Sequence, residues 1–457
     1  MPATKTNTHE LTSAIETLRE MIRADELDRR QPSGPAAVYT TMVTIWMMTM
    51  QRLGGGKSLN AVVKDVLAHS RDLLPNNRRL REGTLSETSG AYAEARSRVE
   101  LKTVEFFANR VCDSLIDASP SWFDGRRAFI LDGTTITLPP TPELQKAFPP
   151  ATNQHGDTVW PVALLLVAHE LQSGCALPPE IGAMYGANNT SEARLSEALV
   201  RRLPAGSIVL ADSGSGIFSV AYATVQAGHE VLFRLTKSRF KPLRRQAALV
   251  AEGDGYKTWR LRWTPSGKDR QSHPELPEDA AVDVWLHEVP LDNGETLYLV
   301  TTLTVDAQQA GEFYRRRYDV ELDIRAIKIQ LGMDVLRCQS PEMVRREIWT
   351  CLLAYNLIRK TILESAKRSG LSPRQISFTA AMQKVAASWV SVLVLSEASL
   401  ALLVEADLEH LARHRVGHRP NRVEPRKVKR RPKPHKLLTE PRDTARAKIL
   451  SGQEGQD

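Results

Sequence analysis

The period of apolar and polar positions changes along the chain and divides it into regions. In the first 125 residues apolar side chains recur at three- and four-residue steps, a pattern that predicts helices. The runs QPSGP and RLGGGK interrupt it, so we expect helices at residues 11–22, 36–52, 59–67 and 89–115. The glycines of GGGKS are interpreted as a helix cap, because a phosphate-binding loop needs a preceding strand and a glycine where Gln51 stands.

From residue 127 short apolar runs replace the helical period and predict strands. AFILDGTTITL, VWPVALLLVAHEL and CALPPEIGAM read as three strands, followed by a helix at 191–203 and the strand SIVLAD. A helix at about 217–226 and the strand EVLFRLT come next. The order β-β-β-α-β-α-β indicates an α+β or α/β fold, with helices on a mixed sheet and ligands gathered where strands end.

A second set of strands interrupts this order. YKTWRLRW, VDVWLHEV and ETLYLVTTL alternate in polarity, and Asp292-Asn293-Gly294 joins the last two as a hairpin turn. The expected organisation is a helical N-terminal DNA-binding domain at 1–125, a core at 126–236 and 304–360, a β-rich insertion at 237–303, a helical region at 361–409 and a basic disordered tail at 410–457.

Residues 314–328, YRRRYDVELDIRAIK, hold polar side chains at a spacing that could bring them together in a catalytic site. Read as part of one helix beginning near residue 307, it carries an apolar stripe suited to packing on a sheet. A neighbouring stripe consists of Tyr314, Arg317, Glu321 and Lys328. One carboxylate thus lies among two cations and a phenol at the margin of the core. The alternative is a solvated charged face, the commoner outcome for a single amphipathic helix.

The composition is that of an ordinary soluble protein, with 42% hydrophobic and 25% charged residues and no apolar run long enough to span a bilayer. The net charge of +8 is concentrated in residues 413–436, which hold eleven Lys or Arg against Glu424. Four prolines in that segment argue against a helix, so we expect an arm that contacts the phosphate backbone of nucleic acid, or else a solubilising tail. The four cysteines lack metal-ligand spacing and no secretion signal precedes them, which favours a reducing cytoplasm.

Two acids on predicted strands become candidates to join Glu321. Asp132 lies within or at the end of the first strand, and Asp212 follows a later one. Three converging carboxylates repel one another unless cations neutralise them, and carboxylate oxygens select Mg²⁺ or Mn²⁺. Two such ions, with Asp132 shared between them, would suit phosphoryl transfer, with Arg317 and Lys328 as phosphate ligands. A carboxylate-pair glycosidase is the rival reading, but it accounts for neither these cations nor the basic tail.

The spacing of Tyr314, Arg317, Glu321 and Lys328 resembles the motif of the DDE transposases of bacterial insertion sequences, in the large cut-and-paste family. DGTTITLP and IVLAD are similar to its first and second acidic motifs, and LLAYNLIR to the helix that follows the glutamate. The resemblance runs from about residue 89 to 359. It departs in two places, because Ser-Gly-Ser follows the second aspartate in place of an arginine and an aromatic, and Tyr318 replaces a tryptophan.

The resemblance implies a ribonuclease H-like core with a β-strand insertion before the glutamate. It implies a DNA transposase that hydrolyses transposon ends, through a hairpin intermediate, and transfers a strand to target DNA. Two Mg²⁺ (or Mn²⁺) ions would be held by Asp132, Asp212 and Glu321, the catalytic acids. DNA would be bound by Tyr314, Arg317, Tyr318 and Lys328. Terminal inverted repeats and target DNA are the expected partners, bound by a homodimer in the synaptic complex. The expected location is the cytoplasm of a bacterium, with association to the nucleoid when the protein is bound to DNA. No association with a membrane is expected. The alternative is a non-catalytic, domesticated DNA-binding protein of the same fold.

Overall fold

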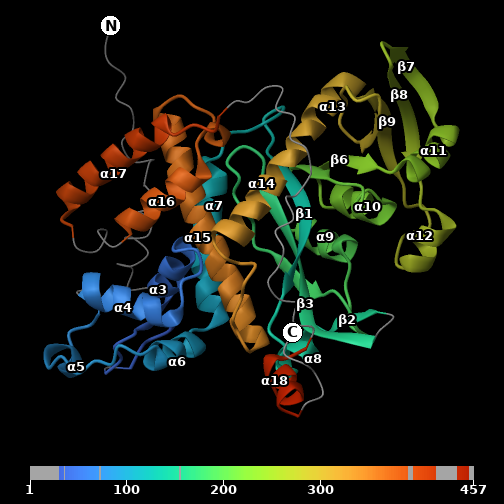
Figure 1. Ribbon diagram of the computed structural model, residues 1–457. Helices are drawn as coiled ribbons and strands as arrows, with labels where there is room; N and C mark the ends of the chain where they lie inside the picture. The colour runs from blue at the N-terminus through green and yellow to red at the C-terminus, as the bar shows by residue number, and fades with distance from the viewer. Residues whose placement is uncertain are drawn as a thin grey trace, which may run out of the picture.

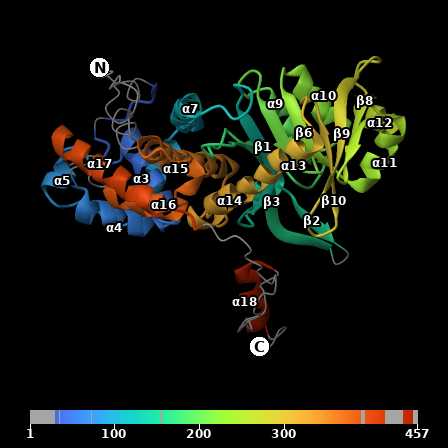
Figure 2. The ribbon, with the colours of Figure 1, turned by 90° about the horizontal axis from the view of Figure 1, so that it is seen from above.

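The computed structural model describes residues 30–34, 36–71, 74–153, 156–389, 395–417 and 440–451 (Figure 1). One side of the molecule is a group of helices and the other is a twisted sheet with helices on both faces (Figure 2). The helix pair α13 (Ala307–Arg315) and α14 (Asp319–Arg325) runs from the sheet toward the helical side. The segment with the transposase-like motif therefore lies where the two halves meet.

The sheet has the strand order β2-β3-β1-β5-β6-β10-β9-β8-β7, with β4 beside β3. β1 pairs in parallel with β5 and antiparallel with β3, and β5 pairs in parallel with β6. The part β4-β3-β1-β5-β6 is the mixed sheet expected from the sequence, and the ribonuclease H-like fold class is confirmed. Its strands are β1 (Ala128–Thr137), β3 (Gly156–Glu170), β4 (Glu180–Ala183), β5 (Ile208–Ala211) and β6 (Glu230–Leu235), and the short β2 (Pro150–Asn153) pairs with β3.

Alternate residues of the central strands face two different cores, as the period of a strand requires. Phe129, Leu131 and Val209 pack with α9 (Glu192–Val200) and α10 (Phe218–Gln226). Their neighbours Ile130 and Leu210 face α13 and α14 on the other side. Burial on both faces explains the unbroken apolar runs of β1 and β5, which flank the acids of interest.

The β-rich insertion extends the sheet, because β10 pairs antiparallel with β6. The hairpin predicted at Asp292-Asn293-Gly294 joins β9 to β10, and Gly294 has the positive φ of 80° that such a turn needs. The elements of the insertion are α11 (Lys237–Gln246), β7 (Ala248–Gly253), β8 (Tyr256–Trp263), α12 (Gly267–Ser272), β9 (Val282–Pro290) and β10 (Thr296–Thr301).

The long helix α15 (Pro341–Arg368) forms the centre of the helical side and packs against α7 and α3. The glycines of GGGKS do cap a helix, because the Gly54 N–H donates to the Met50 carbonyl at the end of α3. The helix expected at 89–115 is broken in two at Val99, and the one expected at 11–22 lies outside the described residues. The N-terminal helices are α3 (Thr41–Leu53), α4 (Leu59–His69), α5 (Arg78–Arg81), α6 (Gly90–Arg98) and α7 (Leu101–Ala118).

The C-terminal segment differs from the expected disordered tail in two described stretches. The helix α17 (Glu397–Arg413) continues past residue 409, where its Leu411 is fully buried, and α18 (Arg442–Leu450) forms a separate short helix. Most of the basic run, residues 418–436, lies outside the described residues. The remaining helices here are α16 (Phe378–Ser388) and the 3₁₀ turn η4 (Pro373–Gln375). No helix in the described ranges has the length and apolar character needed to cross a membrane.

Candidate active site

The first two acids come together because of strand register. β1 and β5 are parallel, and Leu131 is paired with Ala211. Asp132 is the next residue of β1 and Asp212 directly follows β5, so they occupy adjacent positions where the two strands run about 4.8 Å apart. Parallel pairing thus places two carboxylates side by side at the end of β5, as the sequence predicted.

Glycines beside both aspartates shape the backbone around them. The Gly133 N–H donates to Oδ1 of Asp132 at 3.1 Å, and the Gly214 N–H donates to Oδ1 of Asp212 at 2.8 Å. In the Ser-Gly-Ser-Gly loop, a Cβ at Gly216 would lie 2.1 Å from the Arg234 carbonyl oxygen, so only glycine fits. The loop also receives the Arg239 guanidinium from α11, which donates to the carbonyls of residues 213 and 216. A basic residue thus reaches this loop from the insertion.

The helix carrying the third acid is interrupted twice, whereas the sequence predicted one continuous helix. It begins as predicted at Ala307, where Asp306 accepts from the Gln309 N–H at 2.7 Å. A 3₁₀ turn, η2 (Arg316–Tyr318), separates α13 from α14, and a π turn, η3 (Ala326–Gln330), follows α14. Such local changes of winding are frequent at functional sites, and periodicity alone does not reveal them.

Arg317 connects the helix to the aspartates. Its guanidinium donates to Oε1 of Glu321 at 2.7 Å and is the favourable charge that acts most strongly on Asp132. Glu321 is 48% exposed and in this conformation is paired with the arginine. Tyr314 is buried at 7% exposure, and the Arg317 charge acts on its hydroxyl, so the ring has no open path to DNA in this conformation.

Lys328 and Tyr318 are the other two residues expected to bind DNA. Lys328, in the π turn, donates to the Thr135 carbonyl at 3.0 Å and to the Thr134 hydroxyl at 3.3 Å, and its ammonium is 3.2 Å from Asp334. It therefore ties the turn to β1, two residues beyond Asp132. Tyr318 is 58% exposed and presents an aromatic face to solvent.

A fourth carboxylate, which sequence reasoning missed, reaches the aspartates from α9. Burial raises the pKa of Asp132 to about 6, with repulsion from Asp212 and Glu192 adding to the effect and Arg317 opposing it. Burial and then Asp212 also raise the pKa of Glu192. In the sequence Glu192 reads as an acid in the first turn of a helix, where the dipole favours it. The signal that could have revealed it is the glycine after Asp132 and the one near Asp212, both of which leave room for another side chain.

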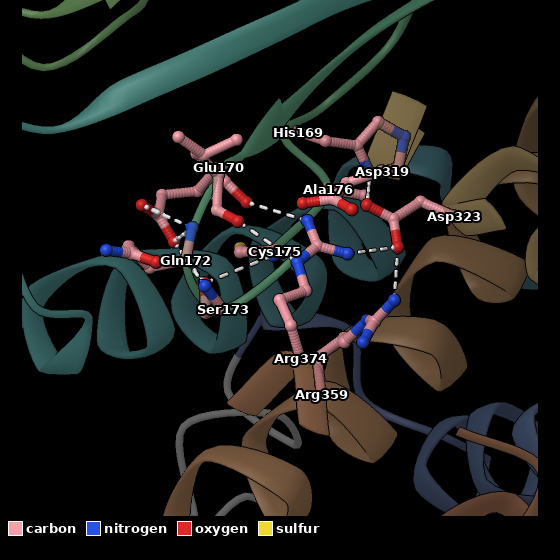
Figure 3. A network of polar contacts seen from close by, with 12 residues as sticks. His169, Glu170, Gln172, Ser173, Cys175, Ala176, Asp319, Asp323, Arg359 and Arg374 are labelled. Atoms are coloured by element: carbon pink, nitrogen blue, oxygen red, sulfur yellow. Dashed lines mark hydrogen bonds and ion pairs between the residues drawn. The ribbon is translucent and has the colours of Figure 1, made fainter. Parts of the chain in front are cut away.

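A buried ionic network anchors α14 two residues beyond Glu321 (Figure 3). Asp323 is fully buried, accepts from Arg374 at 2.7 Å and pairs with Arg359 of α15. Its other oxygen is 3.6 Å from Nδ1 of His169 on β3. Burial alone raises the pKa of Asp323, but Arg374 and Arg359 outweigh it and hold that pKa well below its usual range. The network fixes α14 to β3 and α15, so Glu321 projects from a rigid support.

The donor set at the sheet end suits a hard divalent cation. Asp132, Asp212, Glu192 and Glu321 offer carboxylate oxygens, the ligands that Mg²⁺ and Mn²⁺ prefer. Within the described ranges, no three His, Cys, Asp or Glu side chains converge closely enough to form a complete metal site, and Glu321 is turned to Arg317. Uncompensated repulsion among the other acids is what a bound cation would relieve.

Comparison with known proteins identifies the class. Residues 124–357 match the family described as "Transposase DDE domain". The chain belongs to this family of DDE transposases, as the spacing of the motif residues predicted. Transposase InsG for insertion sequence element IS4, from Escherichia coli strain K12, is 27% identical over 352 residues, which cover 74% of each protein. The solved structure of an endonuclease V from Ciona intestinalis in complex with DNA is 8% identical, and the match covers 53% of this chain and 92% of that one. Its TM-score of 0.19 is too low to support a structural comparison.

Proposed function

We propose that this protein cleaves DNA at the ends of an insertion sequence and joins the freed strand to target DNA, in cut-and-paste transposition through a hairpin intermediate. The observation that carries the proposal is the register of β1 and β5, which places Asp132 beside Asp212 within range of Arg317 and hence of Glu321. Membership of the DDE transposase family supports the same chemistry.

In this proposal Asp132, Asp212 and Glu321 would hold two divalent cations. When bound, the ions would activate a water or a 3′-hydroxyl and stabilise the leaving oxygen of an in-line displacement. Glu321 reaches a ligand position once Arg317 releases it. The arriving phosphate provides the reason for that release, because an arginine fork binds phosphate as well as carboxylate. DNA binding and completion of the metal site are then one event.

The remaining motif residues are proposed to hold the DNA. Lys328 supplies a point charge to the phosphate backbone close to β1. The exposed ring of Tyr318 offers a stacking surface for a base. Tyr314 acts through Arg317 in this conformation, and direct contact of its ring with DNA stays a prediction that requires a rearrangement.

The proposed partners are the terminal inverted repeats and the target DNA, bound by a homodimer in the synaptic complex. The N-terminal helices and the basic run at 413–436 are the proposed sources of further DNA contacts, the second of them sequence-independent because it presents charge to phosphates.

The decisive test is incubation of the protein with labelled DNA that carries the flanking inverted repeats, with and without Mg²⁺. We expect nicking and double-strand cleavage at the ends only when Mg²⁺ is present. Specific binding without cleavage at any Mg²⁺ or Mn²⁺ concentration would instead support the domesticated DNA-binding alternative.

A further inference from the structure

Glu192 lies close to Gly133 of β1 and to the loop that follows β5. It is the first residue of α9, which Ser191 caps by accepting from the Arg194 N–H at 3.3 Å. A Cβ built on Gly133 would be 2.2 Å from Oε1 of Glu192, and one built on Gly214 would be 3.4 Å from its Oε2. The carboxylate therefore occupies the space left by the absent side chain of Gly133 and reaches the backbone that orients Asp212.

This position is held without any compensating cation in the structure. The Glu192 carboxylate makes no hydrogen bond or ion pair with any described residue, and the acids that act on it and on which it acts are Asp212 and Asp132. Two fully buried acids elsewhere in the described residues are each paired with two arginines, Asp323 with Arg359 and Arg374 and Glu347 with Arg52 and Arg96. Like charges placed together at a cost are a feature of sites that bind cations.

We propose that Glu192 is a fourth carboxylate ligand of the divalent-cation site, binding together with Asp132 and Asp212. The inference rests on the proposed function and adds to it a residue from a third element, α9. It also assigns a role to Gly133, whose missing side chain is what lets the carboxylate approach the aspartates. A bound cation would draw these three acids together, and Glu321 would join when Arg317 turns to DNA.

The test uses the full-length protein without DNA and measures Mn²⁺ binding by calorimetry and by the electron paramagnetic resonance signal of free Mn²⁺. Glu192→Gln keeps the shape of the side chain and should weaken Mn²⁺ binding at least ~10-fold, since even indirect metal partners contribute that much. The matched control is Glu197→Gln on the same helix, whose carboxylate faces His273 at 3.9 Å. It should bind Mn²⁺ as the unaltered protein does, and Asp212→Asn should lose binding.

Thermal unfolding separates a ligand from a structural residue. Removing a repelled charge should leave the melting temperature of metal-free Glu192→Gln unchanged or higher, whereas a structural glutamate would lower it. Gly133→Ala would displace the Glu192 carboxylate with its added methyl group and without any change of charge. It should therefore also weaken Mn²⁺ binding.

The outcomes distinguish this inference from the proposed function. Unchanged Mn²⁺ affinity in Glu192→Gln, with binding lost in Asp212→Asn, would overturn the role of Glu192 and leave the proposed function standing. Absence of Mn²⁺ binding by the unaltered protein, together with no Mg²⁺-dependent cleavage, would overturn both.

Discussion

Glu321 and Asp323 lie two residues apart on α14 and have opposite surroundings. The side chain of Glu321 is 48% exposed and shares one arginine with Asp132 of the sheet. Asp323 is fully buried and is neutralised by two arginines with its second oxygen near His169. One short helix thus carries an acid that is left available and an acid that is fixed. The difference indicates that buried carboxylates neutralised by two arginines build the support, while the acids of the candidate site share a single arginine.

The largest expected effect is on catalysis at the acids of the candidate site. Asp132→Asn, Asp212→Asn and Glu321→Gln should each reduce cleavage of transposon-end DNA by about 10³-fold or more, because several kcal/mol of metal-based stabilisation are lost. Binding to the uncleaved ends should stay measurable by gel shift, since the docking surface is intact. Near-normal nicking by any of these variants would remove that residue from the site.

The next effect is on stability at the compensated acid. Asp323→Asn should lower the free energy of unfolding by about 3–5 kcal/mol, because it leaves two buried arginines without their carboxylate. Asp319→Asn is the matched control on the same helix, and its partly exposed pair with Arg316 at 2.9 Å should cost under ~1 kcal/mol. Chemical denaturation of both variants measures the difference. Equal losses in the free energy of unfolding would show that Asp323 supports the fold no more than Asp319 does.

Sequence reasoning predicted candidate acids because their positions follow from local rules. Apolar runs with an aspartate inside or at their end predicted Asp132 and Asp212 at one end of the sheet, and the four-residue motif predicted the helix that carries Glu321. The order of strands and helices along the core and the hairpin at Gly294 followed from the same patterns.

What the sequence did not reveal depends on contacts between distant segments. The Asp323 network draws on β3, α14, α15 and the turn at Arg374, which no periodicity links. Glu192 approaches the site only because the fold brings α9 over Gly133. The 3₁₀ and π turns around α14 keep the side-chain pattern of a helix, so the interruptions were not visible in the sequence.

Protonation should affect the two regions with opposite sign. Asp132 has a pKa of about 6, above the 3.8 of a free aspartate, so its contribution to stability is present at low pH and is lost as pH rises through 6. Burial lowers the pKa of His169 to about 4, below its usual 6.5, so its contribution is present above pH 6.5 and is lost as pH falls toward 4. Lowering the pH should therefore reduce the electrostatic repulsion at Asp132 while weakening the ionic network around Asp323.

Melting temperatures of the metal-free protein between pH 4 and pH 7.5 measure this opposition. Relative to the unaltered protein, Asp132→Asn should become progressively more stable as pH rises from 4 to 6.5. His169→Asn should show the reverse, with its deficit shrinking as pH falls over the same interval. Curves parallel to that of the unaltered protein would show that neither group titrates as its surroundings imply.

The smallest effect is expected at Lys328, which belongs to both regions because it ties the π turn to β1 and is also proposed to contact phosphate. Lys328→Gln keeps a donor for the Thr135 carbonyl and removes the charge. Affinity for transposon-end DNA should fall by roughly tenfold or less, and the slope of log K against log salt should become shallower by about 0.9, the value for one phosphate contact. Lys257→Gln, which breaks a pair with Glu252 on β7, is the charge-matched control and should leave the slope unchanged. A lower melting temperature with an unaltered slope would assign Lys328 to the support alone, because a lysine that only holds the turn against β1 releases no counterions when DNA binds.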